Sequence, residues 1–262
     1  MTTVLDILNC IQSFAPTYMK ESWDRVGLNC GYINAPVTKV LVALDPFETV
    51  CQEAKNLGAE LIVTHHALLW NPGFITDETA AGRNALFLIK NGIAHINAHT
   101  NLDCTPGGVN DTLAQVLGLT DIQVIVPSGT DDNGKPWGLL RQGLIPSQPL
   151  SAFLSHIKST LGCKGLRYAD GGNPVHRVAV GGGSCAGSLQ QAFAAGCDTF
   201  VTADIRYNQF WDAAELGINL IDAGHFYTEN PVCQVLADII LQNFPELSVT
   251  ISKNHRDIMN FG

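Results

Sequence analysis

A strand–helix–strand unit that occurs twice constrains the fold of this chain more than any other feature. In the first copy, Val40–Leu44 is an apolar run, Phe47–Leu57 has helical periodicity, and Glu60–Thr64 is a second apolar run. Gly58 follows the helical stretch directly, at the place where a residue in the left-handed conformation commonly ends a helix. Because a helix joins the two strands, the unit predicts a parallel sheet covered by helices.

The second copy lies at a constant offset from the first. Three pairs of segments align: Lys39–Val42 with Arg177–Val180, Gly58–Thr64 with Gly196–Thr202, and Gly92–Ala98 with Gly217–Ala223. The first two pairs align without a gap, whereas the first copy holds extra residues before the third pair, which we place in a loop around Trp70–Thr79. Any two such units look alike in pattern, but a long ungapped match favours internal duplication. Two distant copies are not a short-period solenoid.

We therefore predict an α/β fold with two similar lobes, in which mainly parallel strands are flanked by helices. The lobes are expected at residues 1–126 and 175–262, packed as one globular unit, with a small α+β linking segment at residues 127–174. Turn-forming residues open that segment at Ser128–Gly134. Its pattern then predicts a strand, a helix and a short strand: Leu139–Ile145, Leu150–Leu161 and Leu166–Ala169.

Composition excludes several classes of protein. The 46% of apolar residues rules out general disorder, and the net charge of −9 makes nucleic acids and anionic membranes poor partners. A small anionic substrate would need metal ions or backbone amides to hold it. No apolar run is long enough for a transmembrane helix, and the first residues predict an amphipathic helix rather than a signal peptide. Eight scattered cysteines without a C-x-x-C pair favour reduced thiols and a cytoplasmic location.

Histidine and carboxylate side chains follow the predicted strands at their carboxyl ends, where ligands gather in parallel α/β sheets. These side chains are His65 and His66 after the second strand, His99 and Asp103 after Gly92–Ala98, and His225 and Glu229 after Gly217–Ala223. The last two pairs share the spacing His-x-x-x-carboxylate, and Asp204 occupies the place of His66 in the second copy. Such donors suit Zn, Fe, Mn or Ni, and because there are more than four, they predict two divalent ions.

A glycine-rich turn, Gly181–Gly187, is a second candidate site. It follows a strand, opens a helix and fits G-x-G-x-x-A, the pattern of a dinucleotide-binding turn. The equivalent turn of the first copy, Ala43–Glu48, has no glycine, which argues against that interpretation. Two others stay open. The turn either leaves room for a neighbouring site, or binds a substrate phosphate through its backbone amides near Ser184 and Ser188.

Two further carboxylates have more than one interpretation. Asp45 ends a strand and Asp24 precedes a turn, so each either orients a ligand histidine or acts as an ordinary turn residue. Cys104 is an unfavoured soft ligand beside Asp103. The remaining histidines have no partner at a useful spacing, and we expect structural or surface roles for them: His95, His156, His176 and His255.

Four motifs in this order resemble the Nif-three-like family, whose bacterial members are called GTP cyclohydrolase I type 2 homologues. They are Ser22-Trp23-Asp24-x-x-Gly27-Leu28-x-x-Gly31, Thr64-His65-His66, His99-x-x-x-Asp103 with Gly107-Gly108-x-Asn110, and Gly224-His225-x-x-x-Glu229. The resemblance runs from about residue 4 to residue 250. It implies two α/β lobes, a homohexamer, and a dinuclear metal centre in the cleft between the lobes, with five ligands: His65, His66, Asp103, His225 and Glu229.

The resemblance also implies a reaction, in which metal-activated water opens the imidazole ring of GTP and formate is released. We predict His99 and Asp204 as catalytic residues, with His99 transferring protons. Many members have glycine where Ala203 stands and histidine where Asn208 stands. The resemblance therefore supports metal binding more strongly than it supports catalysis. Three alternatives remain: phosphoester hydrolysis at the same centre, a metal- or partner-binding ring without catalysis, and an NAD-dependent oxidoreductase.

Overall fold

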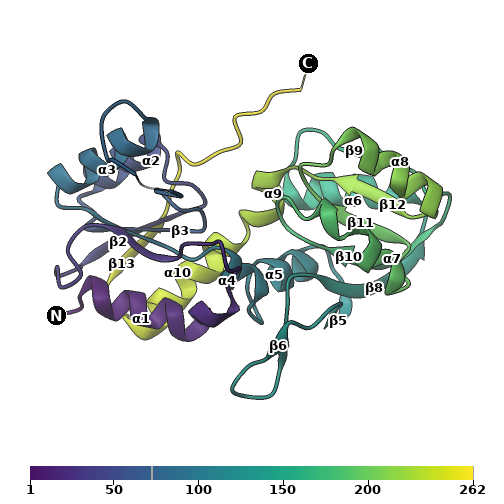
Figure 1. Ribbon diagram of the computed structural model, residues 1–262, viewed down its shortest axis with the longest axis horizontal. Helices are drawn as coiled ribbons and strands as arrows, with labels where there is room; N and C mark the ends of the chain where they lie inside the picture. Colours follow the sequence, from purple (N-terminus) through teal and green to yellow (C-terminus); the bar gives the residue numbers. More distant parts are fainter. Residues whose placement is uncertain (72, 262) are drawn as a thin grey trace. The chain divides into compact units, whose positions relative to one another are not determined.

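The chain forms two compact units, seen here in a computed structural model that describes residues 1–71 and 73–261. Unit 1 comprises Met1–Thr105 and Cys233–Arg256, and unit 2 comprises Pro106–Val232 and the residues from Asp257 onward. Each unit contains a mixed sheet with helices on both faces (Figure 1). The predicted α/β class with two lobes is therefore confirmed. Within the described residues, no helix has the length and apolar character needed to cross a membrane.

Unit 1 is built on a five-stranded sheet with the order β1-β4-β3-β2-β13. Its strands are β1 (Gly27–Cys30), β2 (Lys39–Ala43), β3 (Leu61–Thr64), β4 (Ala94–Asn97) and β13 (Ser248–Ile251). All are parallel except β1, which runs antiparallel to β4. Helices α2 (Glu48–Leu57) and α3 (Ala80–Lys90) cover one face, and α1 (Val4–Phe14) and α10 (Val232–Asn243) cover the other (Figure 1). A short helix, α4 (Thr100–Cys104), and a 3-10 turn, Thr17–Met19, complete the unit.

Local signals in the sequence explain where the helices of unit 1 begin and end. Helix α1 starts after Thr3, whose hydroxyl accepts a hydrogen bond from the Asp6 amide while the Asp6 carboxylate accepts one from the Thr3 amide. Val4, Ile7 and Ile11 form its buried stripe. Helix α2 ends at Gly58, which has a φ of 67° and thus the left-handed conformation that favours glycine.

Unit 2 is built on a six-stranded sheet with the order β5-β8-β10-β11-β12-β9. Its strands are β5 (Thr120–Val124), β8 (Arg141–Gln148), β9 (Arg167–Ala169), β10 (Val175–Val180), β11 (Thr199–Thr202) and β12 (Asn219–Asp222), beside a small hairpin of β6 (Gly129–Thr130) and β7 (Pro136–Trp137). The central strands β10, β11 and β12 are parallel, and the outer strands are antiparallel.

Apolar clusters on both faces of this sheet hold its helices. One contains side chains of α5 (Val109–Val116) and α6 (Leu150–Leu161), and the other contains side chains of α7 (Leu189–Ala194) and α8 (Tyr207–Leu216). The strands alternate between the two clusters, since Val178 and Val180 enter the first while Ala179 enters the second. A 3-10 turn (Ala186–Ser188) precedes α7, and the short helix α9 (His225–Glu229) follows β12.

The register of the strands supports the inferred duplication. Equivalent residues pair in both units: Val40 with Leu61 and Val178 with Thr199, then Leu61 with Ala94 and Thr199 with Asn219. A strand register is sensitive to a shift of one residue, so this agreement across two strand pairs is a structural counterpart of the sequence match.

The boundaries of the units differ from the ranges expected for the lobes. The segment at 127–174 is not a separate linker, because β8 and β9 pair within the sheet of unit 2. The C-terminal strand β13 leaves the second copy and pairs with β2 of unit 1. The helix expected at Leu150–Leu161, within the segment 127–174, is found as predicted. The loop around Trp70–Thr79 precedes α3, and its Pro72 lies outside the described residues.

Candidate metal centre

Three imidazoles gather at the carboxyl ends of β3 and β4 in unit 1. His65 and His66 follow β3 directly, and His99 stands two residues after β4, where it precedes helix α4. The ring centroid of His65 lies 4.8 Å from that of His66 and 5.1 Å from that of His99. One ligand nitrogen of each ring lies within 4.8 Å of the others, which is close enough to share a metal ion.

Each of these imidazoles has an oxygen atom close to Nδ1. The Ala98 carbonyl oxygen (3.0 Å) and Asp45 Oδ1 (2.7 Å) are the hydrogen-bond partners of His65 and His66, and Asp24 Oδ2 lies 3.0 Å from His99 Nδ1 in an ion-pair contact. A proton on Nδ1 leaves the lone pair on Nε2, which is the nitrogen that can coordinate a metal. Histidine ligands of metals are oriented in this way in proteins, so the three side chains fit a metal ion.

Asp103 adds a carboxylate to the same cluster. It lies on α4 with 7% of its surface exposed, and its Oδ1 is 3.5 Å from His65 Nε2. The negative charge of this buried carboxylate would attract a divalent cation and partly neutralise it. Unit 1 therefore brings together His65, His66 and Asp103, three of the predicted ligands, and adds the predicted proton carrier His99.

Asp24 is a buried carboxylate that fixes His99. It accepts hydrogen bonds from the Thr100 amide (3.0 Å) and the Thr100 hydroxyl (2.5 Å), and its Oδ2 lies 3.0 Å from His99 Nδ1. Burial alone would raise the pKa of Asp24, but the contacts with His99 and Thr100 outweigh burial and hold the pKa below its usual range. Asp24 and Asp45 thus orient one candidate histidine each, which is the first of the two roles considered for them.

Unit 2 places a second histidine and carboxylate on helix α9. His225 and Glu229 are four residues apart and share one face, with His225 Nε2 3.0 Å from Glu229 Oε2. His225 Nδ1 contacts Asp204 Oδ2 at 2.7 Å, so this ring has the same arrangement as the three in unit 1. Asp204 has a φ of 53°, a left-handed conformation that Asp tolerates better than most residues. Its predicted catalytic role stays a prediction; its observed contact is with His225.

The glycine-rich turn makes room for Glu229. A Cβ atom on Gly183 would lie 2.0 Å from Glu229 Oε1 and 3.0 Å from His225 Nε2, and Gly183 has a φ of 61°. Only glycine avoids both the clash and the backbone strain at this position. This contact supports the interpretation in which the turn leaves space for a neighbouring site.

Several amides of the same turn already have acceptors within unit 2. The Gly182 amide donates to Asn110 Oδ1 (2.7 Å), the Gly183 amide to Thr228 Oγ1 (3.0 Å), and the Cys185 amide to Thr202 Oγ1 (3.2 Å). Ser184 is exposed and Ser188 is half-buried. Phosphate binding by Ser184 and Ser188 stays a prediction, now restricted to the turn's other amides and its hydroxyls.

The two His-x-x-x-carboxylate motifs share their spacing but do not occupy equivalent positions in the two copies. Helix α4 begins at Thr100, three residues after the end of β4, and α9 begins at His225, three residues after the end of β12. The structural equivalents of His225 and Glu229 are therefore Thr100 and Cys104, one residue further on than the spacing indicates.

The histidines predicted to be structural have such contacts. His95 is completely buried on β4, and its Nε2 lies 2.8 Å from Thr64 Oγ1. His156 and His176 contact backbone carbonyls, and His255 accepts a hydrogen bond from the Leu44 amide. No local pattern indicates the contact between His95 and Thr64, because the two residues lie on different strands.

The donor set decides which metals the residues fit. The candidate metal-binding groups among the described residues contain only imidazole and carboxylate. Among the described residues the eight cysteines form no disulfide, and burial raises the pKa of Cys51 to about 12 and that of Cys30 to about 11. Because these groups contain no thiol, the set suits borderline divalent ions such as Zn, Fe, Mn or Ni.

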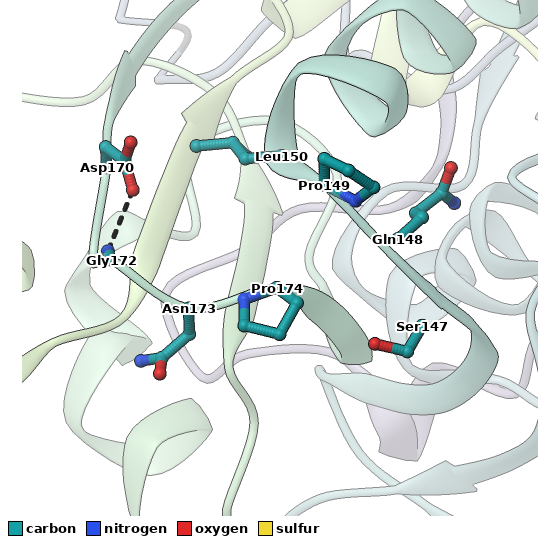
Figure 2. A pocket seen from close by; sticks show the side chains of 8 residues that line it. All are labelled: Ser147, Gln148, Pro149, Leu150, Asp170, Gly172, Asn173 and Pro174. Carbon is teal, nitrogen blue, oxygen red and sulfur yellow. Dashed lines mark hydrogen bonds between the residues drawn. The ribbon is translucent and has the colours of Figure 1, made fainter.

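Unit 2 also contains a hollow of about 470 Å³, whose lining includes none of the candidate ligands. Figure 2 shows its two sides. One side is the junction between β8 and α6, and the other is the connection from β9 to β10. Its one carboxylate, Asp170, accepts a hydrogen bond from the Gly172 amide (2.8 Å), and Leu150 and Pro174 line the remainder. With no histidine or cysteine in its lining, it offers no metal site.

The sequence profile of the Duf34/NIF3 family (NGG1p interacting factor 3) matches residues 2–258. The chain belongs to this family. A protein of Clostridium perfringens called GTP cyclohydrolase 1 type 2 homolog is 38% identical over 259 residues, covering 98% of both chains. A Streptomyces coelicolor protein with the same name is 35% identical over 271 residues, covering 98% of this chain and 93% of its own.

Solved structures of the family have the same fold. A Bacillus cereus protein related to NIF3 superimposes with a TM-score of 0.94 at 26% identity, covering 100% of this chain and 99% of its own. The Staphylococcus aureus protein SA1388 gives a TM-score of 0.92 at 29% identity over 99% of both chains. Reduced HcgD from Methanocaldococcus jannaschii gives 0.80 at 26% identity, over 97% of this chain and 98% of its own. The resemblance seen in the motifs is confirmed over the full length.

Proposed function

We propose that this NIF3-family chain is a metal-dependent hydrolase that acts on a purine nucleotide such as GTP. The observation that carries the proposal is the common arrangement of three histidines, His65, His66 and His225, each with a hydrogen-bond partner at Nδ1 that makes Nε2 the nitrogen able to coordinate a metal. Structural histidines have no reason to share this arrangement beside carboxylates. The name of the 38%-identical relative supports the substrate class.

Five residues would hold two divalent cations: His65, His66, Asp103, His225 and Glu229. Bound cations of this kind supply a water of lowered pKa as a nucleophile. Asp45 and Asp204 orient His66 and His225 through Nδ1 and so fix which nitrogen each ring presents. Gly183 leaves the space in which the Glu229 carboxylate lies.

His99 is the proton carrier in this proposal. Its Nδ1 is 3.0 Å from the Asp24 carboxylate, which stabilises the imidazolium formed when Nε2 accepts a proton. The Asp24 carboxylate is buried, and its pKa is held below its usual range, so it stays ionised beside the ring. Hydrolysis of the guanine imidazole ring needs such a group, because protons must be removed from the water and delivered to the ring nitrogen that leaves.

The proposal is tested by measuring formate released from GTP by the metal-loaded protein. We expect turnover by the natural sequence and background formate from His65→Ala and Asp103→Ala, with ion content measured on each sample. If the natural sequence releases no more formate than these variants, the reaction is wrong even where metal is bound. A parallel assay with p-nitrophenyl phosphate then separates phosphoester hydrolysis from a protein that binds metal without catalysis.

A further inference from the structure

Two tryptophans of unit 1 lie against the imidazole cluster with much of their surface exposed. The Trp70 ring centroid is 4.7 Å from that of His99 and 6.4 Å from that of His66, and the Trp23 centroid is 6.0 Å from that of His99. Trp23 is 64% exposed and Trp70 is 43% exposed. Both indoles meet His99 at steep angles, 68° and 81°, so each makes an edge-to-face contact with the imidazole.

Both indoles are held in place by well-anchored neighbours. Trp23 precedes Asp24, whose carboxylate is fixed by Thr100 and His99. Trp70 follows Leu68 and Leu69, whose amides both donate to Asn29 Oδ1 (3.0 and 3.2 Å) and whose side chains pack in or against the core under α2 and α3. The chain thus buries the leucines and leaves the much larger indole of Trp70 outside that core.

Exposed indoles beside polar groups indicate a ligand rather than packing. Two large aromatic side chains that contact the same imidazole leave apolar surface in water, which is unfavourable unless something covers it. The faces of indole rings stack with flat π systems, and nucleobases use tryptophan in this way. The net charge of −9 argues that affinity comes from the base, because the chain as a whole repels phosphate.

We infer that Trp23 and Trp70 bind the flat heteroaromatic base of the substrate by stacking and hold it beside His99. This inference rests on the proposed function, since it names the part of the substrate that the site recognises. It assigns a substrate-binding role to these two residues. The base then contributes more to the affinity than the ribose and the phosphates do. Flat heteroaromatic compounds without phosphate are therefore ligands in their own right.

The experiment measures binding to the metal-loaded full chain by calorimetry and tryptophan fluorescence, with guanosine, GMP and inorganic tripolyphosphate as probes. We expect guanosine and GMP to bind and to quench fluorescence. Trp23→Leu and Trp70→Leu each weaken guanosine binding about tenfold, whereas tripolyphosphate binding does not change. Trp211→Leu, which removes an exposed indole from α8 of unit 2, is the matched control and retains guanosine affinity.

Phenylalanine variants separate stacking from a loss of structure. Trp70→Phe and Trp23→Phe keep a smaller aromatic face, so they recover part of the affinity that the leucine variants lose, at unchanged ion content. The inference is overturned if guanosine fails to bind the natural sequence, or if both leucine variants bind guanosine as the Trp211→Leu control does. Recovery by phenylalanine supports it even where a leucine variant folds poorly.

Formate release in the same samples keeps this inference distinct from the proposed reaction. If GTP is not hydrolysed but guanosine still binds in a manner dependent on Trp23 and Trp70, the reaction is wrong and the stacking stands. If GTP is hydrolysed with the same KM by the natural sequence and both leucine variants, the reaction stands and the stacking is wrong.

Discussion

At the scale of single residues, one hydroxyl connects the buried sheet of unit 1 to the candidate ligands. Thr64 Oγ1 donates a hydrogen bond to the His66 carbonyl oxygen (2.5 Å), so the same oxygen must accept from His95 Nε2 (2.8 Å). This chain of hydrogen bonds places a proton on His95 Nε2. Burial keeps the ring neutral at pH 7, since it lowers the pKa of His95 to about 3.

The depressed pKa of His95 predicts a loss of stability in mild acid. In the unfolded chain the imidazole binds a proton near pH 6.5, whereas in the folded chain it does so only near pH 3. Its contribution is therefore complete above pH 6.5 and falls by about 1.4 kcal/mol per pH unit between these values. Urea unfolding at pH 7, 6 and 5 measures the slope. His95→Gln keeps a donor for Thr64 without titrating, and an unchanged slope in this variant would contradict the assignment.

A methyl group on Gly183 is expected to damage the second half of the candidate site. Gly183→Ala places a Cβ atom 2.0 Å from Glu229 Oε1 and strains the backbone, with a cost of about 1–3 kcal/mol. We expect a lower unfolding temperature and reduced ion content, measured by thermal melting and elemental analysis. Gly187→Ala is the matched control, because its Cβ would meet nothing within 4 Å. Equal effects of the two substitutions would refute the close approach of Glu229.

The sequence predicted most candidate donors but few of their partners. Strand ends are visible as the ends of apolar runs, so His65 and His66 are placed by local pattern alone. The group that orients each imidazole comes from a distant segment, as Asp24 does for His99, and no local pattern encodes that pairing. For the same reason the sequence places Trp70 only in a loop, because its contact with His99 depends on how that loop folds back.

At the scale of helices and strands, the side chains that follow equivalent strands differ in function between the two copies. Strand β3 is followed by His65 and His66, whereas β11 is followed by Ala203 and Asp204, and Asp204 orients a histidine from another element. In unit 1 the residue that orients His66 is Asp45, which follows β2. The duplicated framework supplies positions at the sheet edge, and each copy fills them with its own donors.

A carboxylate at a strand end is expected to tune the metal ligand that it touches. Asp45→Asn removes the negative charge next to His66 Nδ1, and loss of such a partner typically weakens metal binding 10–100-fold. Competition with a chelator of known affinity measures the change. Asp212→Asn, on the exposed surface of α8, controls for the change in net charge. If both variants retain the affinity of the natural sequence, Asp45 is an ordinary turn residue.

The elements were more predictable than their pairing. Helix Leu150–Leu161 was predicted to the residue, and the strand expected at Leu139–Ile145 is found at Arg141–Gln148. The pattern did not reveal that β8 joins the sheet of unit 2 or that β13 joins that of unit 1. Sheet membership depends on contacts between distant residues, and a strand as short as Ser248–Ile251 gives little periodicity.

At the scale of the whole molecule, the family resemblance implies assembly into a homohexamer. We expect light scattering coupled to size exclusion to give a mass six times the 28.1 kDa of one chain, at micromolar concentration and moderate salt. A mass of a single chain under these conditions would contradict the prediction. Repeating the measurement after chelation shows whether the bound ions contribute to assembly.

Strand β13 has a consequence for how the protein is made. Without Ser248–Ile251, β2 is the open edge of the sheet in unit 1, with its backbone groups unpaired. All six strands of the other sheet lie between Thr120 and Asp222, so they leave the ribosome earlier. The half of the chain that is synthesised first is therefore the half that is completed last, and until β13 arrives the edge of β2 stays open to pairing with another strand.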